Sequence, residues 1–401
     1  MRKRFALITA LAGLAALTLP VMTVPASAQQ NQDPFGGLFG AWEIALPPKE
    51  AGEDLTRMSD ALAKLPPQRP GVVDTYVLSV SLWNEPVFEN EAREAANVLA
   101  RRYDSAERTV VLSAGRGGGA PRTFPSFTPN NFNAALSRIG KLADPNEDLV
   151  IVFITSHGSP DGNVVAQEKN RLIGGIRAQH LRASLQQSGI RTSLLMISAC
   201  FAGNYILPFS NDDTVILTAA AADKTSFGCA PQRDWTYFGD AMFNHALRGG
   251  EGIMDAFDMA RGIITKWEND LHAEWAAKPA SQRAKEQEPQ PSNPQQNAGD
   301  NALAVIAKAE RYGQSINCAG HLSFALDRAR TGRPLKGLAD VASITSAQTA
   351  AQARATTEGQ LRGRSSQDTA KAVVAVSTSA LQLYPAQPAD IADLAARCMA
   401  P

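Results

Sequence analysis

The chain has 401 residues, with 39 basic and 39 acidic side chains and a formal net charge of zero at pH 7. This balance gives no electrostatic attraction to nucleic acid or to an anionic membrane surface, so neither is expected as a partner. This length of 401 residues is enough for one large domain with an appendage, or for two domains.

The amino terminus has the pattern of a secretory signal peptide. A basic head precedes the apolar run Phe5–Val24 and the small-residue cleavage site Ala26–Ala28. Pro20 and Pro25 interrupt the apolar stretch, and no basic stop-transfer cluster follows, which argues against a membrane anchor. We therefore expect residues 1–28 to be removed. The mature protein would then be periplasmic or secreted by a bacterium, without an integral membrane span.

Strands and helices alternate after a lead-in, residues 29–70, whose Pro, Gly and polar residues predict loose order. The expected strands are Tyr76–Leu82, Thr109–Ser113, Leu149–Thr155, Ser193–Ser198 and Thr214–Thr218. The expected helices are Glu89–Tyr103, Thr128–Leu142 with Thr128 as cap, Leu181–Gln187, Tyr237–Leu247 and Met254–Ala273. This alternation predicts an α/β domain over residues 71–275, with a mostly parallel sheet covered by helices on both faces.

The composition changes after residue 275. Residues 276–301 are rich in Pro and Gln and predict a solvated loop. Residues 302–401 form a C-terminal extension that we expect to be loosely ordered, because its segment Ser343–Thr369 has almost no large apolar residue. That segment is either a linker or a polar helix. An ordered unit is expected at Ala302–Ala329 and a short final helix at Ile391–Met399.

Two residues able to carry out nucleophilic chemistry come directly after predicted strands. His157 follows the strand that ends at Thr155, and Cys200 follows the strand that ends at Ser198. An imidazole beside a thiol generates the reactive thiolate. The backbone amides of Gly158 and Cys200 would then bind the oxyanion of a tetrahedral intermediate. Each residue taken singly has an ordinary interpretation, as a buried thiol or a hydrogen-bonded imidazole.

Four segments resemble one peptidase family. They are LVIVFITSHGSP at 149–160, LLMISACFAG at 194–203, the stretch Thr218–Cys229, and WTYFGD at 235–240. Together they resemble the legumain-like cysteine peptidases, family C13, in their bacterial branch within the caspase-like clan. The resemblance covers residues 74–261. It implies a caspase-like fold and a cysteine endopeptidase acting on polypeptides, with His157 and Cys200 as the catalytic dyad and no cofactor.

The resemblance also indicates a substrate pocket. Asp240 matches an acidic residue on the P1 side of the family's pocket, although it also fits the start of a helix. Ser226 could line the pocket wall or serve as a turn residue. Ser198 stands where legumain carries Glu, and Trp83 begins a segment where legumain carries an Arg-His pair. We therefore expect Asn, Arg or Lys at P1, rather than Asp.

Two other functions remain open at this stage. The fold could serve as a non-catalytic interaction module, although retention of both dyad residues argues against it. The same acyl-enzyme could also be resolved by an amine, which would make the protein a peptide ligase. The sequence does not distinguish hydrolysis from ligation, and it leaves the oligomeric state undetermined.

The four cysteines are far apart, and none forms a C-x-x-C pair, so no metal or redox motif is indicated. Export favours disulfides, yet Cys200 must stay free for chemistry. Cys229 belongs to the stretch that resembles the catalytic domain, whereas Cys318 and Cys398 both lie in the C-terminal extension. We therefore expect a Cys318–Cys398 bridge, provided that the two Cα atoms come within about 7 Å.

Overall fold

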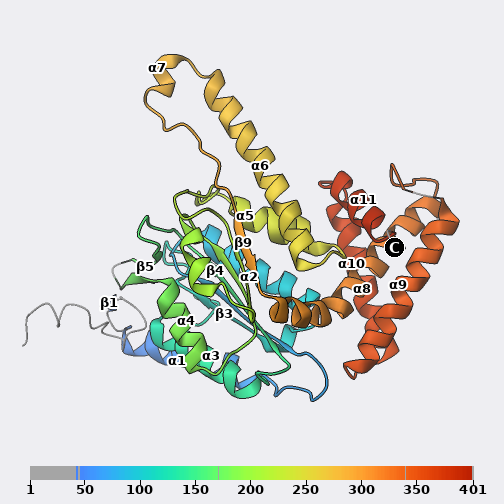
Figure 1. The fold of residues 1–401 in the computed structure, drawn as a ribbon, viewed down its shortest axis with the longest axis horizontal. Coiled ribbons are helices and arrows are strands. Elements are labelled where there is room, and N and C mark those ends of the chain that lie inside the picture. Colours follow the sequence, from blue (N-terminus) through green and yellow to red (C-terminus); the bar gives the residue numbers. More distant parts are fainter. Residues whose placement is uncertain (1–41, 44–45, 170, 339, 400–401) are drawn as a thin grey trace, which may run out of the picture. The chain divides into compact units, whose positions relative to one another are not determined.

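The computed structural model describes residues 42–43, 46–169, 171–338 and 340–399 (Figure 1). All of them belong to one compact unit, residues 33–401. The predicted signal peptide, residues 1–28, lies outside the described residues. Among the described helices, none combines the length and apolar character needed to cross a bilayer.

A six-stranded sheet in the order β3-β2-β4-β7-β8-β9 forms the centre of the fold (Figure 1). Its strands are β2 (Thr75–Ser81), β3 (Thr109–Ser113), β4 (Leu149–Thr155), β7 (Ser193–Ser198), β8 (Thr214–Thr218) and β9 (Gln295–Ala298). All neighbouring pairs are parallel except β8 with β9. The predicted mostly parallel sheet is therefore confirmed.

Successive residues of each strand face opposite sides of the sheet, so a fully apolar strand supplies two cores. In β4, Val152 and Ile154 belong to one apolar cluster, and Ile151 and Phe153 belong to the other. The first face is covered by α1 (Pro48–Ala63), α3 (Pro129–Leu142) and α4 (Ala178–Gln187). The second is covered by α2 (Pro86–Arg102), α6 (Ile253–Ala277) and the first part of α8 (Asp300–Arg330). Helices cover both faces, as predicted.

Local signals explain why α3 begins where it does. The Thr128 side chain accepts a hydrogen bond from the Asn131 N–H at 3.0 Å, and Pro129 occupies the first turn. Both features favour a helix start, because a capping oxygen satisfies a free N–H and proline has none to satisfy. The helix ends at Leu142, as expected.

The structure differs from the sequence prediction in the lead-in and in the Pro/Gln-rich segment. Residues 48–63 of the lead-in form α1, whose Asp54 accepts hydrogen bonds from the Ser126 N–H and hydroxyl. In the predicted loop 276–301, α7 (Ala280–Arg283) follows α6, and residues 295–298 form β9. The polar sequence of β9 is accommodated because β9 is an edge strand of the sheet, paired only with β8.

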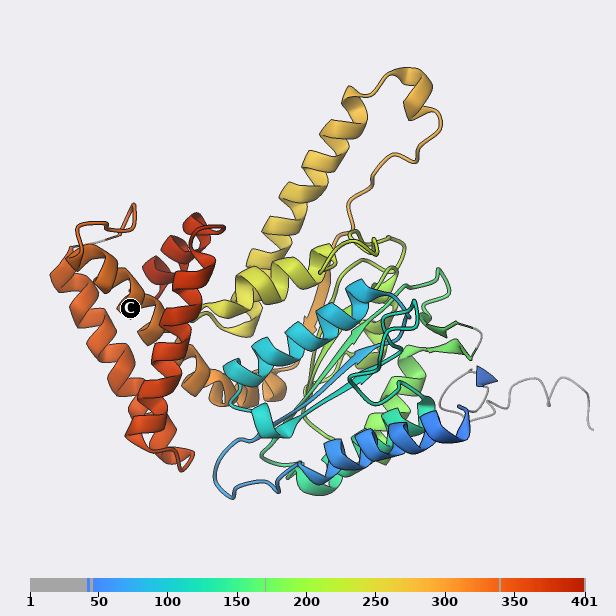
Figure 2. The ribbon, with the colours of Figure 1, turned by 180° about the vertical axis from the view of Figure 1, so that it is seen from behind.

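Two strand pairings were not predicted from the sequence. β5 (Val164–Glu168) and β6 (Leu172–Ile176) form a hairpin just after His157, and β1 (Trp42–Glu43) pairs with β6. Helix α6 extends beyond the ends of the strands and carries α7 at its far end, before the chain returns to β9 (Figure 2).

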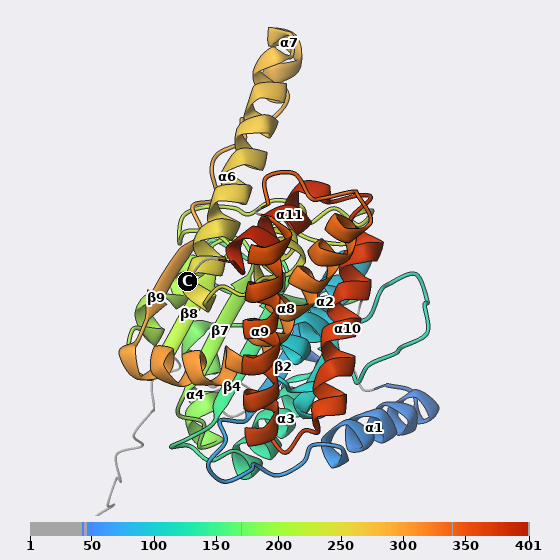
Figure 3. The same cartoon turned by 90° about the vertical axis from the view of Figure 1, so that its right-hand side faces the viewer.

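The C-terminal extension is helical. It consists of α8, α9 (Val341–Leu361), α10 (Ser366–Leu383) and α11 (Pro388–Arg397), and α9 and α10 pack along α8 (Figure 3). These helices share an apolar cluster of their own. Of the two readings left open for residues 343–369, the helical one is confirmed.

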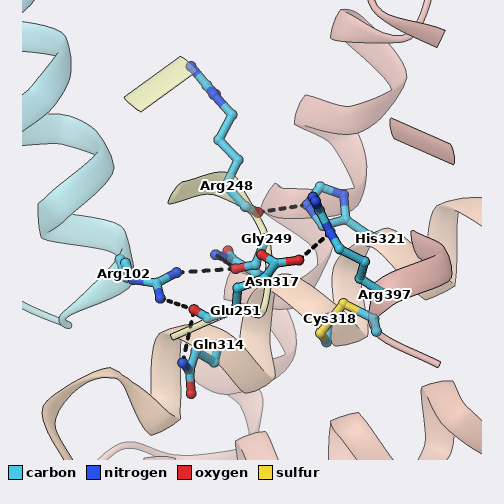
Figure 4. The surroundings of a disulfide bond; sticks show 10 residues. Arg102, Arg248, Gly249, Glu251, Gln314, Asn317, Cys318, His321 and Arg397 are labelled. Carbon is cyan, nitrogen blue, oxygen red and sulfur yellow. Dashed lines mark hydrogen bonds and ion pairs between the residues drawn. A yellow bond between two sulfur atoms is a disulfide. The ribbon is translucent and has the colours of Figure 1, made fainter. Parts of the chain in front are cut away.

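A disulfide joins Cys318 on α8 to Cys398 directly after α11, with a Cα–Cα distance of 5.2 Å (Figure 4). The predicted pairing is therefore confirmed. Cys200 and Cys229 are free thiols. The bridge attaches the end of α11 to α8, the long helix whose first part covers the sheet.

Candidate active site

His157 and Cys200 follow neighbouring parallel strands at the same level of the sheet. Thr155 in β4 lies opposite Ser198 in β7, and each candidate residue comes two positions later in the chain. The pairing continues past β4, because the Ser156 N–H donates to the Ser198 carbonyl at 3.1 Å. The carboxyl ends of the two strands thus bring the imidazole-bearing and thiol-bearing residues to one edge of the sheet.

Three residues from the β2–α2 region surround the His157 imidazole. The rings of Trp83 and Phe88 contact it edge-on, with centroid distances of 4.7 Å and 5.0 Å. A Glu85 carboxylate oxygen lies 3.9 Å from Nε2. Burial lowers the pKa of His157, and the negative charge of Glu85 partly opposes that shift. The imidazole is therefore largely neutral near pH 7, the form that can accept a proton.

The loop after β8 contacts the Cys200 thiol. The Ser226 N–H donates to Sγ at 3.3 Å, and the Ser226 hydroxyl lies 3.7 Å from the same sulfur. Phe201 has a positive φ of 58°, and its N–H donates to the Lys224 carbonyl at 2.7 Å. A bulky residue in this region of φ is strained, and such strain is concentrated at functional sites.

Gly158 lies against the backbone of Cys200. A β-carbon built at position 158 would stand 1.9 Å from the Cys200 carbonyl oxygen and 3.1 Å from its nitrogen. Only glycine fits such an approach. The two residues predicted to supply oxyanion donors are therefore in direct contact.

Ser198 is buried, with 2% of its surface exposed, and its hydroxyl lies 3.1 Å from the Thr236 hydroxyl. The Thr236 N–H donates to a carboxylate oxygen of Glu91 at 2.8 Å. Burial raises the pKa of Glu91, and hydrogen bonds from Thr236, Ser198 and Thr155 oppose the rise. This buried carboxylate from α2 therefore holds Thr236, which contacts Ser198 at the end of β7 and precedes the segment that leads to Asp240.

The predicted pocket residue Asp240 begins the π-helical turn η5 (Asp240–His245). Its carboxylate accepts a hydrogen bond from Asn244 at 2.9 Å and lies 3.5 Å from His245 and 3.9 Å from Arg233. Those cations and donors keep the pKa of Asp240 low, although burial alone would raise it. Asp240 is thus charged and already surrounded by partners from its own segment, and its role in substrate binding stays a prediction.

Cys229, the second free thiol, lies near the first. Burial raises its pKa to about 12, and the nearby charges of Cys200, Glu91 and Glu85 act in the same direction. Cys229 is therefore protonated at neutral pH and a poor nucleophile.

Glu85, Phe88 and Glu91 were missed at the sequence level, because only the packing of α2 against the strand ends shows what they contact. Within the described segments, no group of three or more His, Cys, Asp and Glu side chains is arranged to hold a metal ion.

Part of the chain is similar to a known peptidase family. Residues 123–281 match the model of the peptidase C13 family. The match covers less than half of the chain. It contains His157, Gly158, Cys200, Ser226 and Asp240, so every site residue taken from the resemblance lies within the match.

Comparisons with solved structures and with curated sequences support no further assignment. The crystal structure of caspase-1 from Spodoptera frugiperda is similar, with 11% identity and a TM-score of 0.38, over 58% of this chain and 92% of that one. No curated protein sequence matches the chain. The C13 segment includes β4, β7 and β8 but excludes β2 and the C-terminal helices from α8 onward.

Proposed function

We propose that this chain is an exported cysteine endopeptidase of legumain-like type, with His157 and Cys200 as its catalytic dyad. The observation that carries the proposal is the shared register of β4 and β7, in which Thr155 lies opposite Ser198 and each reactive residue follows two positions later. This register supports the proposal, because covalent catalysis needs the nucleophile and its base on neighbouring parts of the fold.

In this mechanism the Cys200 thiolate attacks the carbonyl carbon of the scissile peptide bond, after His157 has accepted the thiol proton. The carbonyl oxygen becomes an oxyanion, which the amides of Gly158 and Cys200 stabilise. The C–N bond then breaks as His157 returns the proton to the leaving amine. Water, activated by the neutral imidazole, hydrolyses the thioester and regenerates Cys200. Glu85 stabilises the charged imidazolium form of His157 while it holds the proton, because the Glu85 carboxylate lies 3.9 Å from Nε2.

A fluorogenic peptide library tests this proposal. Cys200→Ala and His157→Ala should each abolish turnover while leaving the circular dichroism spectrum unchanged, because the members of a dyad act as a unit. A thiol-directed activity probe should label Cys200 first. Full activity in Cys200→Ala, or faster labelling of Cys229, would show that the mechanism is wrong.

Substrate preference is the second part of the proposal. Asp240 is charged, and Ser226 lies beside the nucleophile, so P1 should be Asn, Arg or Lys. An Asp at P1 would face a like charge. The profile should lose this preference in Asp240→Ala. A profile dominated by Asp, or one that Asp240→Ala leaves unchanged, counts against the pocket assignment.

Export is the third part. The Cys318–Cys398 disulfide supports it, because structural disulfides persist in oxidising compartments. The expected observation is a mature amino terminus near Gln29 in the periplasm or medium, determined by terminal sequencing. Retention of residues 1–28 on a cytoplasmic protein would exclude export.

A further inference from the structure

A cavity of about 360 Å³ lies between the sheet domain and the C-terminal helices. Its walls come from α2 and the turn η6 (Ala246–Arg248) on one side, and from α8, α10 and α11 on the other. Small-ligand pockets range from about 300 to 1,000 Å³. None of the residues that line it belongs to the candidate active site.

Two guanidinium groups line this cavity, Arg101 from α2 and Arg248 from η6. Neither is ion-paired to any other residue in the described ranges. Arg248 donates to the Asn244 side chain at 3.1 Å, and its buried Nε has no partner. Glu94, the acidic residue in the wall, is already paired with Arg93 at 2.9 Å. The wall therefore carries two arginines against the single carboxylate of Glu94, whose charge acts on both of them.

The two guanidinium groups also destabilise one another. Burial, and after it the charge of Arg101, lowers the pKa of Arg248 to about 10. An anion bound between them would offset this repulsion. The planar fork of donors on each arginine matches a carboxylate.

A neutral acceptor lies deeper in the wall. His321 on α8 is 4% exposed, and its Nε2 lies 3.0 Å from the Arg248 carbonyl, to which it donates. Its Nδ1 is therefore an acceptor, and it is buried without a partner. Burial lowers the pKa of His321 to about 4, so the ring is neutral. In Figure 4 the Arg248 carbonyl faces His321, while the Arg248 side chain points away from the disulfide.

The rest of the wall is mostly aliphatic, with Asn317 and Ser379 as its other polar residues, and includes Val98, Leu247, Val376, Leu383 and Ile391. A ligand that matches the arginines, the His321 acceptor and the aliphatic wall has a carboxylate, an N–H donor and an aliphatic group. These are the parts of a peptide carboxy terminus. We propose that this cavity binds the free carboxy terminus of a peptide whose last residue is aliphatic.

Isothermal titration of the whole mature protein with acetyl-Ala-Leu tests the proposal. We expect one site per chain, and we expect the same ligand to raise the melting temperature, because it binds the folded state. Arg101→Gln and Arg248→Gln should each weaken binding about tenfold, through loss of a charge-assisted hydrogen bond. Arg330→Gln is the matched control. Arg330 is an exposed arginine on α8, the helix that carries His321, and it does not line the cavity.

Two further ligands test the carboxylate contact and the N–H contact separately. Acetyl-Ala-Leu-amide lacks the carboxylate and should not bind, and octanoate lacks the N–H and should bind more weakly than the peptide. Equal binding of the amide, equal or tighter binding of octanoate, or unchanged affinity in both arginine variants would overturn the proposal. Absence of heat and of a thermal shift at millimolar peptide would overturn it as well. Arg101 is exposed, so its variant tests the site even where Arg248→Gln perturbs folding.

Discussion

Gly158 and Cys200 are in backbone contact, so close that a β-carbon on Gly158 would lie 1.9 Å from the Cys200 carbonyl oxygen. The contact couples the turn after β4 to the turn after β7. A side chain at position 158 must therefore displace the residue proposed as nucleophile.

We expect Gly158→Ala to lower kcat/KM about 100-fold, since misplacement of a reacting group by about 1 Å has an effect of that size. Peptide hydrolysis measures the loss, and the melting temperature shows whether the fold survives. Gly262→Ala on α6 is the matched control, because its β-carbon would meet nothing within 4 Å. Full activity in Gly158→Ala would show that the contact does not position the site.

The pH profile should follow the His157 imidazole. Burial lowers its pKa below the ordinary 6.5, and the neutral form is the base. The value of kcat/KM should therefore be at its plateau above pH 6.5 and should fall on acidification below it. Glu85 opposes this shift, so Glu85→Gln should move the acid limb to still lower pH. Glu274→Gln, an exposed change on α6, should leave it in place. An acid limb that moves upward in Glu85→Gln contradicts the assignment.

Glu91→Gln should reduce kcat more than it changes KM, because Glu91 supports residues that precede the dyad rather than the substrate. The substitution also places an amide NH2 group in a buried site beside the Thr236 hydrogen bond, and a buried polar group left unpaired costs about 1–3 kcal/mol of unfolding free energy. Urea denaturation and steady-state kinetics measure the two effects. Glu94→Gln, on the same helix but more exposed, serves as control. A change in KM alone would argue against a positioning role.

His245 should stabilise the docking of α11 in a pH-dependent manner. Burial alone would lower its pKa, but hydrogen bonds with Asp240 and with Asp390, the latter at 2.5 Å, raise it to about 9. The stabilisation is therefore complete below pH 6.5 and is lost as the pH rises through about 9. His245→Gln should lower the melting temperature at pH 6 and match the wild type at pH 10. His272→Gln, an exposed control, should show no such trend.

Removal of the Cys318–Cys398 disulfide should destabilise the C-terminal helices. The bridge spans 80 positions, and the chain-entropy model assigns about 4 kcal/mol to a loop of that length. A Cys318→Ser, Cys398→Ser double variant should show early hydrogen exchange in α9 to α11 and unchanged labelling of Cys200. Identical exchange in both proteins would mean that helix packing alone holds the extension.

The sequence by itself determined the parallel sheet, because buried parallel strands must be apolar along their whole length. Thr109–Ser113, Leu149–Thr155, Ser193–Ser198 and Thr214–Thr218 were predicted with their observed limits. It also indicated His157 and Cys200, since reactive residues in such folds follow strand ends. The disulfide was predicted because Cys200 must stay free and because Cys318 and Cys398 share the C-terminal extension.

Only the tertiary structure decided what surrounds these residues. Strand β9 is polar and was predicted as loop, because its pairing with β8 depends on a segment distant in sequence. Glu85 and Glu91 carry no local signal; the packing of α2 on the sheet places one beside His157 and the other beneath Ser198. The cavity with Arg101 and Arg248 forms where the C-terminal helices meet α2. Periodicity reports which side chains are buried, whereas their partners are set by long-range packing.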